Sequence, residues 1–312
     1  MSNPTHTHTP THTSATPGLV QVATAGVLWG TGGVAVHLVR EHVALSAVAI
    51  TGYRVVIGAL VLLAVLHVAR RTAAATALLR QRPGLVAEVA LSTLCYQLLY
   101  YLAVVQVGVS VATVVTLGLA PLLLTAHEAR ARRRLPGAGR LLTLGVALTG
   151  LVLVTRETGS DTATDASLLG LASAVGSALA YALSTQRSRR LAGHTDEPLA
   201  VAAVTTSLGA AVMGPLLAVL AFTGAPTGTT DPVALVLLAY LGVATMALAT
   251  CLVFSGLRRV SGSSATLATL LEPVSAAALA AALLGERIGG LGWLGIGLVV
   301  AALAGLATRR NP

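Results

Sequence analysis

The stretch from residue 89 to residue 127, VALSTLCYQLLYYLAVVQVGVSVATVVTLGLAPLLLTAH, runs for 39 residues without an Asp, Glu, Lys or Arg. Glu88 precedes it and Glu128 follows it. A transmembrane helix needs about 20 mostly apolar residues to cross a hydrocarbon core about 30 Å thick. The stretch is therefore too long for one buried helix of a soluble protein and long enough for two membrane crossings. It predicts an integral membrane protein.

The composition agrees with this interpretation and excludes several classes of protein. The 312 residues are 55% hydrophobic and 10% charged, with a mean hydropathy of +0.82, whereas a soluble domain carries about 25% charged residues. The net charge of +9 does not indicate nucleic-acid binding, because the arginines form short clusters between apolar spans. Cys95 and Cys251 lie within apolar runs, where we expect them to pack as small apolar residues. No Cys/His spacing suggests a metal site, and we expect no cofactor.

The first 17 residues form a polar segment rich in Thr and Pro. Because it lacks a basic region followed by a short apolar core, it is not a cleavable signal peptide. His6, His8 and His12 could bind a metal as a His-rich tract, but a disordered tail over residues 1–17 is the favoured interpretation.

Uncharged or nearly uncharged runs predict an all-α protein with ten transmembrane helices. The expected spans are 18–38, 44–67, 85–105, 109–127, 138–155, 168–186, 198–222, 233–257, 262–284 and 289–308. Basic loops remain in the cytoplasm. With the N-terminus inside, 16 of the 20 arginines fall on the cytoplasmic side, and only Arg40, Arg156 and Arg287 fall in outside loops. We therefore expect both termini to be cytoplasmic.

The two halves of the chain align at an offset of 152 residues. Thr93 then meets Thr245, Pro121 meets Pro273, and the span boundaries coincide. We expect a first five-helix repeat over residues 18–157 and a second over 166–309. Since five is odd, the second repeat enters the membrane from the opposite side. Inverted repeats of this kind are typical of secondary transporters, whose substrate site lies near the bilayer midplane between the halves.

Several motifs carry a family resemblance over residues 18–308. They are Trp29-Gly30, Arg54, Pro121, Leu271-Glu272-Pro273, Gly285-Glu286-Arg287 and the Gly-rich last helix of each half. In these the chain resembles the EamA-type transporters of the drug/metabolite transporter superfamily. The resemblance implies a plasma-membrane transporter, usually an exporter of amino acids or other small metabolites, with two five-helix bundles around a central cavity. The first half departs from the pattern, since Ala131-Arg132-Arg133-Arg134 stands where the second half has its Gly-Glu-Arg motif.

Glu272 is the sharpest candidate for a functional residue. It lies about ten residues into a predicted span, where an ionised carboxylate costs on the order of 3 kcal/mol and usually faces a cavity or a partner. Pro273 lacks an N–H and frees a carbonyl nearby, and Thr269 lies one turn away on the same face. Glu272 could bind a substrate ammonium or take up a proton. The alternative is a carboxyl group that anchors helix packing.

Arg54 is the only arginine in the interior of a predicted span, since Arg140 lies at the edge of its own span. It could contact an anion or pair with a carboxylate, or it could snorkel toward the outer interface or cap neighbouring carbonyls. A carrier of phosphorylated sugars would need several interior Arg or Lys residues, so this interior argues against sugar phosphates and nucleotide sugars.

Polar stripes at helical spacing predict a cavity wall. They consist of Gln21, Thr24 and Thr31 in the first span, Thr93, Tyr96, Gln97 and Tyr100 in the third, and Ser173, Ser177, Tyr181 and Ser184 in the sixth. Trp29, Tyr96, Tyr100 and Tyr181 lie near mid-span in a chain that is only 3% aromatic, and Trp29 and Tyr181 match across the repeat. Such a wall suits an apolar or amphipathic molecule, including a cation held by cation–π contact. Helix-to-helix hydrogen bonding is the alternative for each hydroxyl group.

We therefore expect a secondary transporter that moves a small organic solute, with the lipid bilayer and possible coupling protons as its other partners. The candidate solute-binding residues are Glu272, Trp29, Tyr96, Tyr100, Tyr181, Thr269 and Arg54. A channel or a non-transporting scaffold is the alternative. A membrane enzyme is disfavoured, because the acidic residues are scattered and no HExxH, DxxD or Ser/His/Asp arrangement is present.

Overall fold

The computed structural model describes residues 15–158, 168–283 and 288–308. Glu286 and Arg287, the three tail histidines, and the first 14 residues of the predicted tail lie outside these ranges. The first helix begins at Ala15, so the last three residues of that predicted tail are helical.

The described chain is helical and contains no strand, as the sequence predicts. Its elements are α1 (Ala15–His42), α2 (Ala47–Val68), α3 (Thr72–Gln81), α4 (Pro83–Arg132), α5 (Ala138–Thr158), α6 (Leu168–Ala192), α7 (Pro198–Phe222), α8 (Pro232–Tyr240), η1 (Leu241–Leu248), α9 (Ala249–Leu257), α10 (Gly262–Ala268), α11 (Leu271–Leu283) and α12 (Gly290–Thr308). These helices supply ten segments long and apolar enough to cross a membrane. The prediction of ten transmembrane helices in two five-helix repeats is confirmed.

The elements and the spans do not correspond one to one. Helix α4 holds the third and fourth spans, separated by a kink at Gly108, whose φ of 80° favours glycine. The eighth span consists of α8, the π-helical turn η1 and α9, and the ninth consists of α10 and α11. The short helix α3 is absent from the prediction, which treated this segment as a link between spans.

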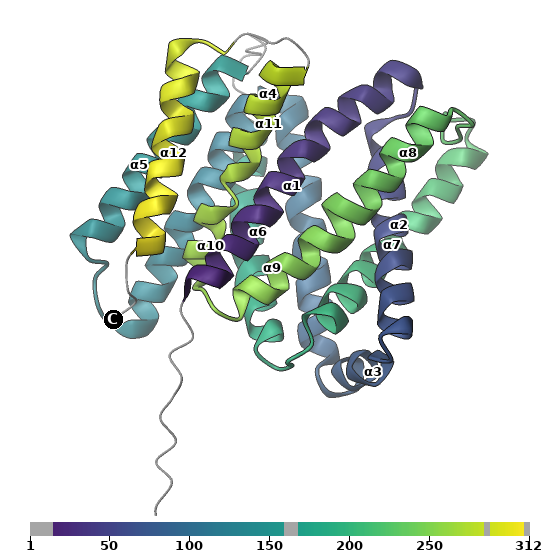
Figure 1. Cartoon of the computed structure of the whole chain (residues 1–312), viewed down its shortest axis with the longest axis horizontal. Coiled ribbons are helices and arrows are strands. Elements are labelled where there is room, and N and C mark those ends of the chain that lie inside the picture. The colour runs from purple at the N-terminus through teal and green to yellow at the C-terminus, as the bar shows by residue number, and fades with distance from the viewer. Residues whose placement is uncertain (1–14, 159–167, 284–287, 309–312) are drawn as a thin grey trace, which may run out of the picture.

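The helices pair across the two repeats. Helix α5 packs against α12, and α2 packs against α7, so the fifth and second helices of each repeat contact their counterparts. Figure 1 shows these pairs at opposite sides of the molecule, with α1 running between α11 and α9 in the middle. Helix α6, the counterpart of α1, packs in the same way against α4. The first helix of each repeat thus packs against the third and fourth spans of the other repeat.

The described chain starts and ends at the same end of the bundle, where α3 also lies (Figure 1). This end carries an ion pair in which an Arg140 nitrogen lies 2.7 Å from a Glu128 carboxylate oxygen. The same carboxylate accepts hydrogen bonds from the backbone N–H and the hydroxyl group of Ser263. The cluster therefore ties α4 and α5 to the start of α10. The cytoplasmic location of this end remains a prediction from the arginine distribution.

The two cysteines differ in their surroundings. Cys251 is half-buried, whereas Cys95 is exposed on the bundle surface. The expectation that both pack in the interior is therefore wrong for Cys95, because the apolar run that contains it also faces outward.

A candidate solute-binding cavity

A cavity of about 390 Å³ lies between the two repeats. Spans 1, 2, 3, 6, 7, 8 and 9 contribute to its wall. All seven residues selected from the sequence line it, namely Trp29, Arg54, Tyr96, Tyr100, Tyr181, Thr269 and Glu272. The structure therefore brings together residues from five different spans, although their role in binding remains a prediction.

Glu272 lies at a break in the ninth span. Helix α10 ends at Ala268 and α11 starts at Leu271, so the expectation of one continuous helix is wrong here. The amide of Glu272 donates to the Thr269 carbonyl at 2.9 Å, three residues back, and Pro273 has no amide hydrogen to donate. The break leaves the carboxylate in the first turn of α11, where the positive end of the helix dipole favours a negative charge.

Helix α1 fits closely against this break through two glycines. A Cβ placed on Gly26 would lie 3.3 Å from the Ala268 carbonyl oxygen, and one placed on Gly30 would lie 2.5 Å from the Glu272 carbonyl oxygen. No larger residue fits at Gly30 without movement of the backbone. The Gly26/Gly30 pair therefore determines how closely α1 and the wall residue Trp29 approach Glu272.

Arg54 and Trp29 meet at one backbone oxygen. The Trp29 indole N–H donates to the Thr245 carbonyl at 2.9 Å, and an Arg54 guanidinium nitrogen donates to the same carbonyl at 3.3 Å. This contact agrees with the alternative that Arg54 caps a carbonyl, and its place in the cavity wall agrees with an anion contact. The hydrogen bond to a buried carbonyl favours capping over snorkelling toward the outer interface.

Arg54 and Glu272 are the two charged residues in the cavity wall. The cavity therefore contains one positive and one negative group in its wall. Such a pair can hold the two charged ends of a zwitterion. Alternatively, the carboxylate can hold a cationic group or the guanidinium group an anionic one.

A pair of aromatic rings lies beside Glu272. The ring centroids of Tyr96 and Tyr181 are 4.9 Å apart and the planes are tilted by 32°. The Tyr181 hydroxyl group is hydrogen-bonded to Thr269 Oγ1 at 3.0 Å, and Tyr100 is hydrogen-bonded to Thr113 at 2.8 Å. The hydroxyl groups of Tyr181 and Tyr100 are thus fixed by partners, and the ring faces and edges remain to contact a solute.

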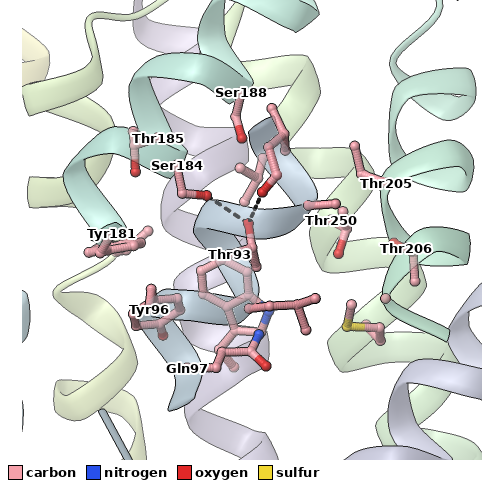
Figure 2. A pocket seen from close by; sticks show the side chains of 18 of the residues that line it. Thr93, Tyr96, Gln97, Tyr181, Ser184, Thr185, Ser188, Thr205, Thr206 and Thr250 are labelled. Atoms are coloured by element: carbon pink, nitrogen blue, oxygen red, sulfur yellow. Dashed lines mark hydrogen bonds between the residues drawn. The ribbon is translucent and has the colours of Figure 1, made fainter. Parts of the chain in front are cut away.

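A second part of the wall is uncharged and rich in hydroxyl groups. Figure 2 shows Thr93 and Ser184 facing each other, with Ser188, Thr205 and Thr250 around the same space. Thr93 Oγ1 and Ser184 Oγ are 2.7 Å apart. The cavity therefore has a charged aromatic part and a neutral hydrogen-bonding part.

The polar stripes in the sequence located this wall only in part. In the third span, Thr93, Tyr96, Gln97 and Tyr100 all line the cavity. In the sixth span Tyr181 and Ser184 do, but Ser173 and Ser177 are buried away from the cavity, and Ser177 donates to the Tyr96 carbonyl.

The polar residues of the first span, Gln21, Thr24 and Thr31, also lie away from the cavity. The sequence did not predict that Thr205, Thr206 and Thr250 line the cavity, because single threonines in long apolar runs do not form a recognisable stripe. No group of three or more His, Cys, Asp or Glu residues is placed to hold a metal within the described ranges.

Comparison with known proteins agrees with this architecture. The family model described as "EamA-like transporter family" matches residues 16–156 and 168–308, two ranges offset by the same 152 residues as the repeat. The chain is 28% identical to "Uncharacterized transporter YwfM" of Bacillus subtilis (strain 168), over 90% of both proteins. It is also 28% identical to "Uncharacterized inner membrane transporter YicL" of Salmonella typhimurium, over 96% of this chain and 98% of that protein.

A solved crystal structure shares the fold, with a TM-score of 0.75 at 20% identity, and the match covers 93% of this chain and 96% of that one. The two ranges matched by the family model, 16–156 and 168–308, correspond to the two repeats of the described bundle. The chain belongs to the EamA-like transporter family and is a multi-pass transporter of the cell membrane.

Proposed function

We propose that the protein is a secondary transporter that exports a small organic solute, such as an amino acid, another metabolite or a drug, by alternating access. The observation that carries the proposal is the cavity between the repeats, with Glu272, Arg54 and five aromatic residues in its wall. In transporters built from inverted repeats the substrate site lies at the repeat interface.

The size and chemistry of the cavity limit the solute. A volume of about 390 Å³ is near the lower end of the range for small-molecule sites, roughly 300–1,000 Å³. One carboxylate and one guanidinium group suit a solute with one cationic group, or with one charge of each sign. A solute with several phosphate charges would need more than one arginine.

The extent of the cavity supports export. Its wall includes Leu257, the last residue of α9, at the end of the bundle that holds the arginine clusters. Toward the opposite end, the lining residues Thr51 and Tyr100 lie about one helical turn inside their spans. If the arginine-rich end is cytoplasmic, the cavity extends farther toward the cytoplasm, from which an exporter takes up its solute.

Glu272 is the residue through which we propose that transport is coupled to protons. It is the one carboxylate in the cavity wall, and it lies at the break between α10 and α11. A carboxylate that holds an ammonium group in one state and a proton in the other would exchange the two across the membrane.

The experiment has two stages. Comparison of metabolites in the medium of cells with and without the protein identifies the exported solute, and counterflow of that solute in proteoliposomes then measures transport directly. We expect Glu272→Gln to abolish counterflow or its pH dependence while the protein remains folded. The matched control is Glu88→Gln, which removes an acid paired with Arg187 outside the cavity.

Wild-type transport with an unchanged pH dependence in Glu272→Gln would refute the proton role. An ohmic current through single proteins in planar bilayers, without counterflow, would instead indicate a channel.

A further inference from the structure

The eighth span contains a π-helical turn, η1, in its middle. In an α-helix each amide bonds to the carbonyl four residues back. The amide of Ala249 bonds instead to the carbonyls of Ala244 and Met246, five and three residues back. The intervening carbonyl, that of Thr245, is therefore not used by Ala249. Single π-helical turns inside α-helices are rare, and those that occur are frequently found at functional sites.

The Thr245 carbonyl accepts the two hydrogen bonds from the cavity wall, from Trp29 at 2.9 Å and from Arg54 at 3.3 Å. Thr245 itself is fully buried, so water does not replace these bonds. A buried carbonyl without a partner is destabilising. The two side chains therefore satisfy the carbonyl that the irregular turn leaves free of Ala249, and the turn supplies their common acceptor.

Two glycines bring α2 and η1 close together at this point. A Cβ placed on Gly242 of η1 would lie 2.5 Å from Ile57 Cβ, and one placed on Gly58 would lie 2.8 Å from Met246 Cβ. Gly58 is one turn after Arg54 on the same face of α2. The close contact of α2 with η1 is thus what allows the guanidinium group to reach Thr245.

We infer that the π-helical turn Leu241–Leu248 is a positioning element of the cavity, which acts through the Thr245 carbonyl to hold Arg54 and Trp29 in place. Thr245 is a positioning residue, since its carbonyl acts on the solute only through these two side chains. The consequence for transport rests on the proposed function, whereas the positioning of Trp29 does not.

Deletion of Val243 tests the inference. A π-helical turn contains one residue more than an α-helical turn, so the deletion allows regular bonding from α8 to α9 while both keep their faces. Val243 is exposed on the surface of the bundle, so no buried side chain is lost. The control is deletion of Val236, an exposed residue in the regular helix α8, which rotates the start of the span by about 100° and should abolish folding.

Trp29 fluorescence provides a measurement that needs no solute. The chain has two tryptophans, and Trp293 is exposed on α12 outside the cavity. In a Trp293→Phe background we expect the deletion to change the emission maximum of Trp29. With the exported solute as the probe, we expect the KM for counterflow to rise roughly tenfold, because a hydrogen bond to a charged group is lost. An unchanged Trp29 emission would overturn the inference even if transport is lost.

Gly58→Ala provides a second test if the deletion variant does not fold. The new methyl group pushes α2 away from η1 and Arg54 away from Thr245, so the same two changes are expected. The combined variant Gly58→Ala, Met246→Ala removes Met246 Cγ, which would lie 2.6 Å from the new methyl group, and should recover part of both. Gly33→Ala is the control, since a Cβ there meets no atom of the described chain within 4 Å. Wild-type emission and wild-type KM in Gly58→Ala would contradict the inference.

Discussion

The contact between α1 and the break in the ninth span gives the sharpest test of the structure. Gly30→Ala places a methyl carbon 2.5 Å from the Glu272 carbonyl oxygen and 2.9 Å from the Ala276 amide nitrogen. Both are backbone atoms, so no side-chain rotation relieves the overlap and α1 must move. Overpacking of this kind costs about 1–3 kcal/mol. We therefore expect the melting temperature of the purified protein in detergent to fall by several degrees.

A series of three glycine variants of α1 tests the close contact. Gly26→Ala meets the Ala268 carbonyl oxygen at 3.3 Å and should lower the melting temperature less than Gly30→Ala. Gly33→Ala, on the same helix but with no described atom within 4 Å, should leave it unchanged or raise it, because alanine favours the helix. Thermal unfolding measured by size-exclusion chromatography after heating provides the order. Equal melting temperatures for the Gly30 and Gly33 variants would refute the close contact.

Three further outcomes are expected from the same structure. Tyr181→Phe removes one hydrogen bond and keeps the ring, so it should cost about 1 kcal/mol of stability, and a larger loss in thermal unfolding would contradict the packing. Glu128→Gln keeps the shape but removes the charge that faces Arg140 at a site where the glutamate side chain is 15% exposed, so it should lower stability by roughly 1–2 kcal/mol in the same assay. In a cysteine-free background, an impermeant maleimide added to intact cells should label Thr223→Cys but not Leu135→Cys, and the reverse result would invert the predicted topology.

The sequence predicted the ten spans because membrane insertion depends on local hydropathy, which a single chain displays directly. It also predicted the composition of the cavity's charged part. Glu272 and Arg54 are each costly in a membrane interior, so each one needs a compensating environment, and a shared cavity supplies it. The aromatic residues followed from their rarity near mid-span.

What the sequence did not predict are the irregular parts of the eighth and ninth spans. Thr245 lies in an apolar run with no proline or glycine at the turn's C-terminal end, and the π-helical turn there depends on contacts with Trp29 and Arg54 from distant segments. Pro273 did indicate a missing hydrogen bond, but not that the helix breaks four residues earlier at Thr269. Tertiary contacts determine both features, so local sequence patterns do not reveal them.

The two repeats differ at the positions that matter most. Thr245 corresponds to Thr93 at the 152-residue offset, and Pro273 corresponds to Pro121. In the first repeat both positions lie in α4, whose one departure from helical geometry is at Gly108. In the second repeat one position lies in the π-helical turn and the other follows the break beside Glu272.

Helix α1 contacts both irregular segments, through Trp29 on one side and through Gly26 and Gly30 on the other. A shift of α1 therefore changes the surroundings of Arg54 and of Glu272 at the same time. Its counterpart α6 packs against α4, which is kinked at Gly108 but is helical at the two corresponding positions, Thr93 and Pro121. If the repeats exchange conformations during transport, α1 is the helix through which the two charged groups of the cavity respond together, and the Gly30→Ala variant should impair transport more than its loss of stability alone would explain.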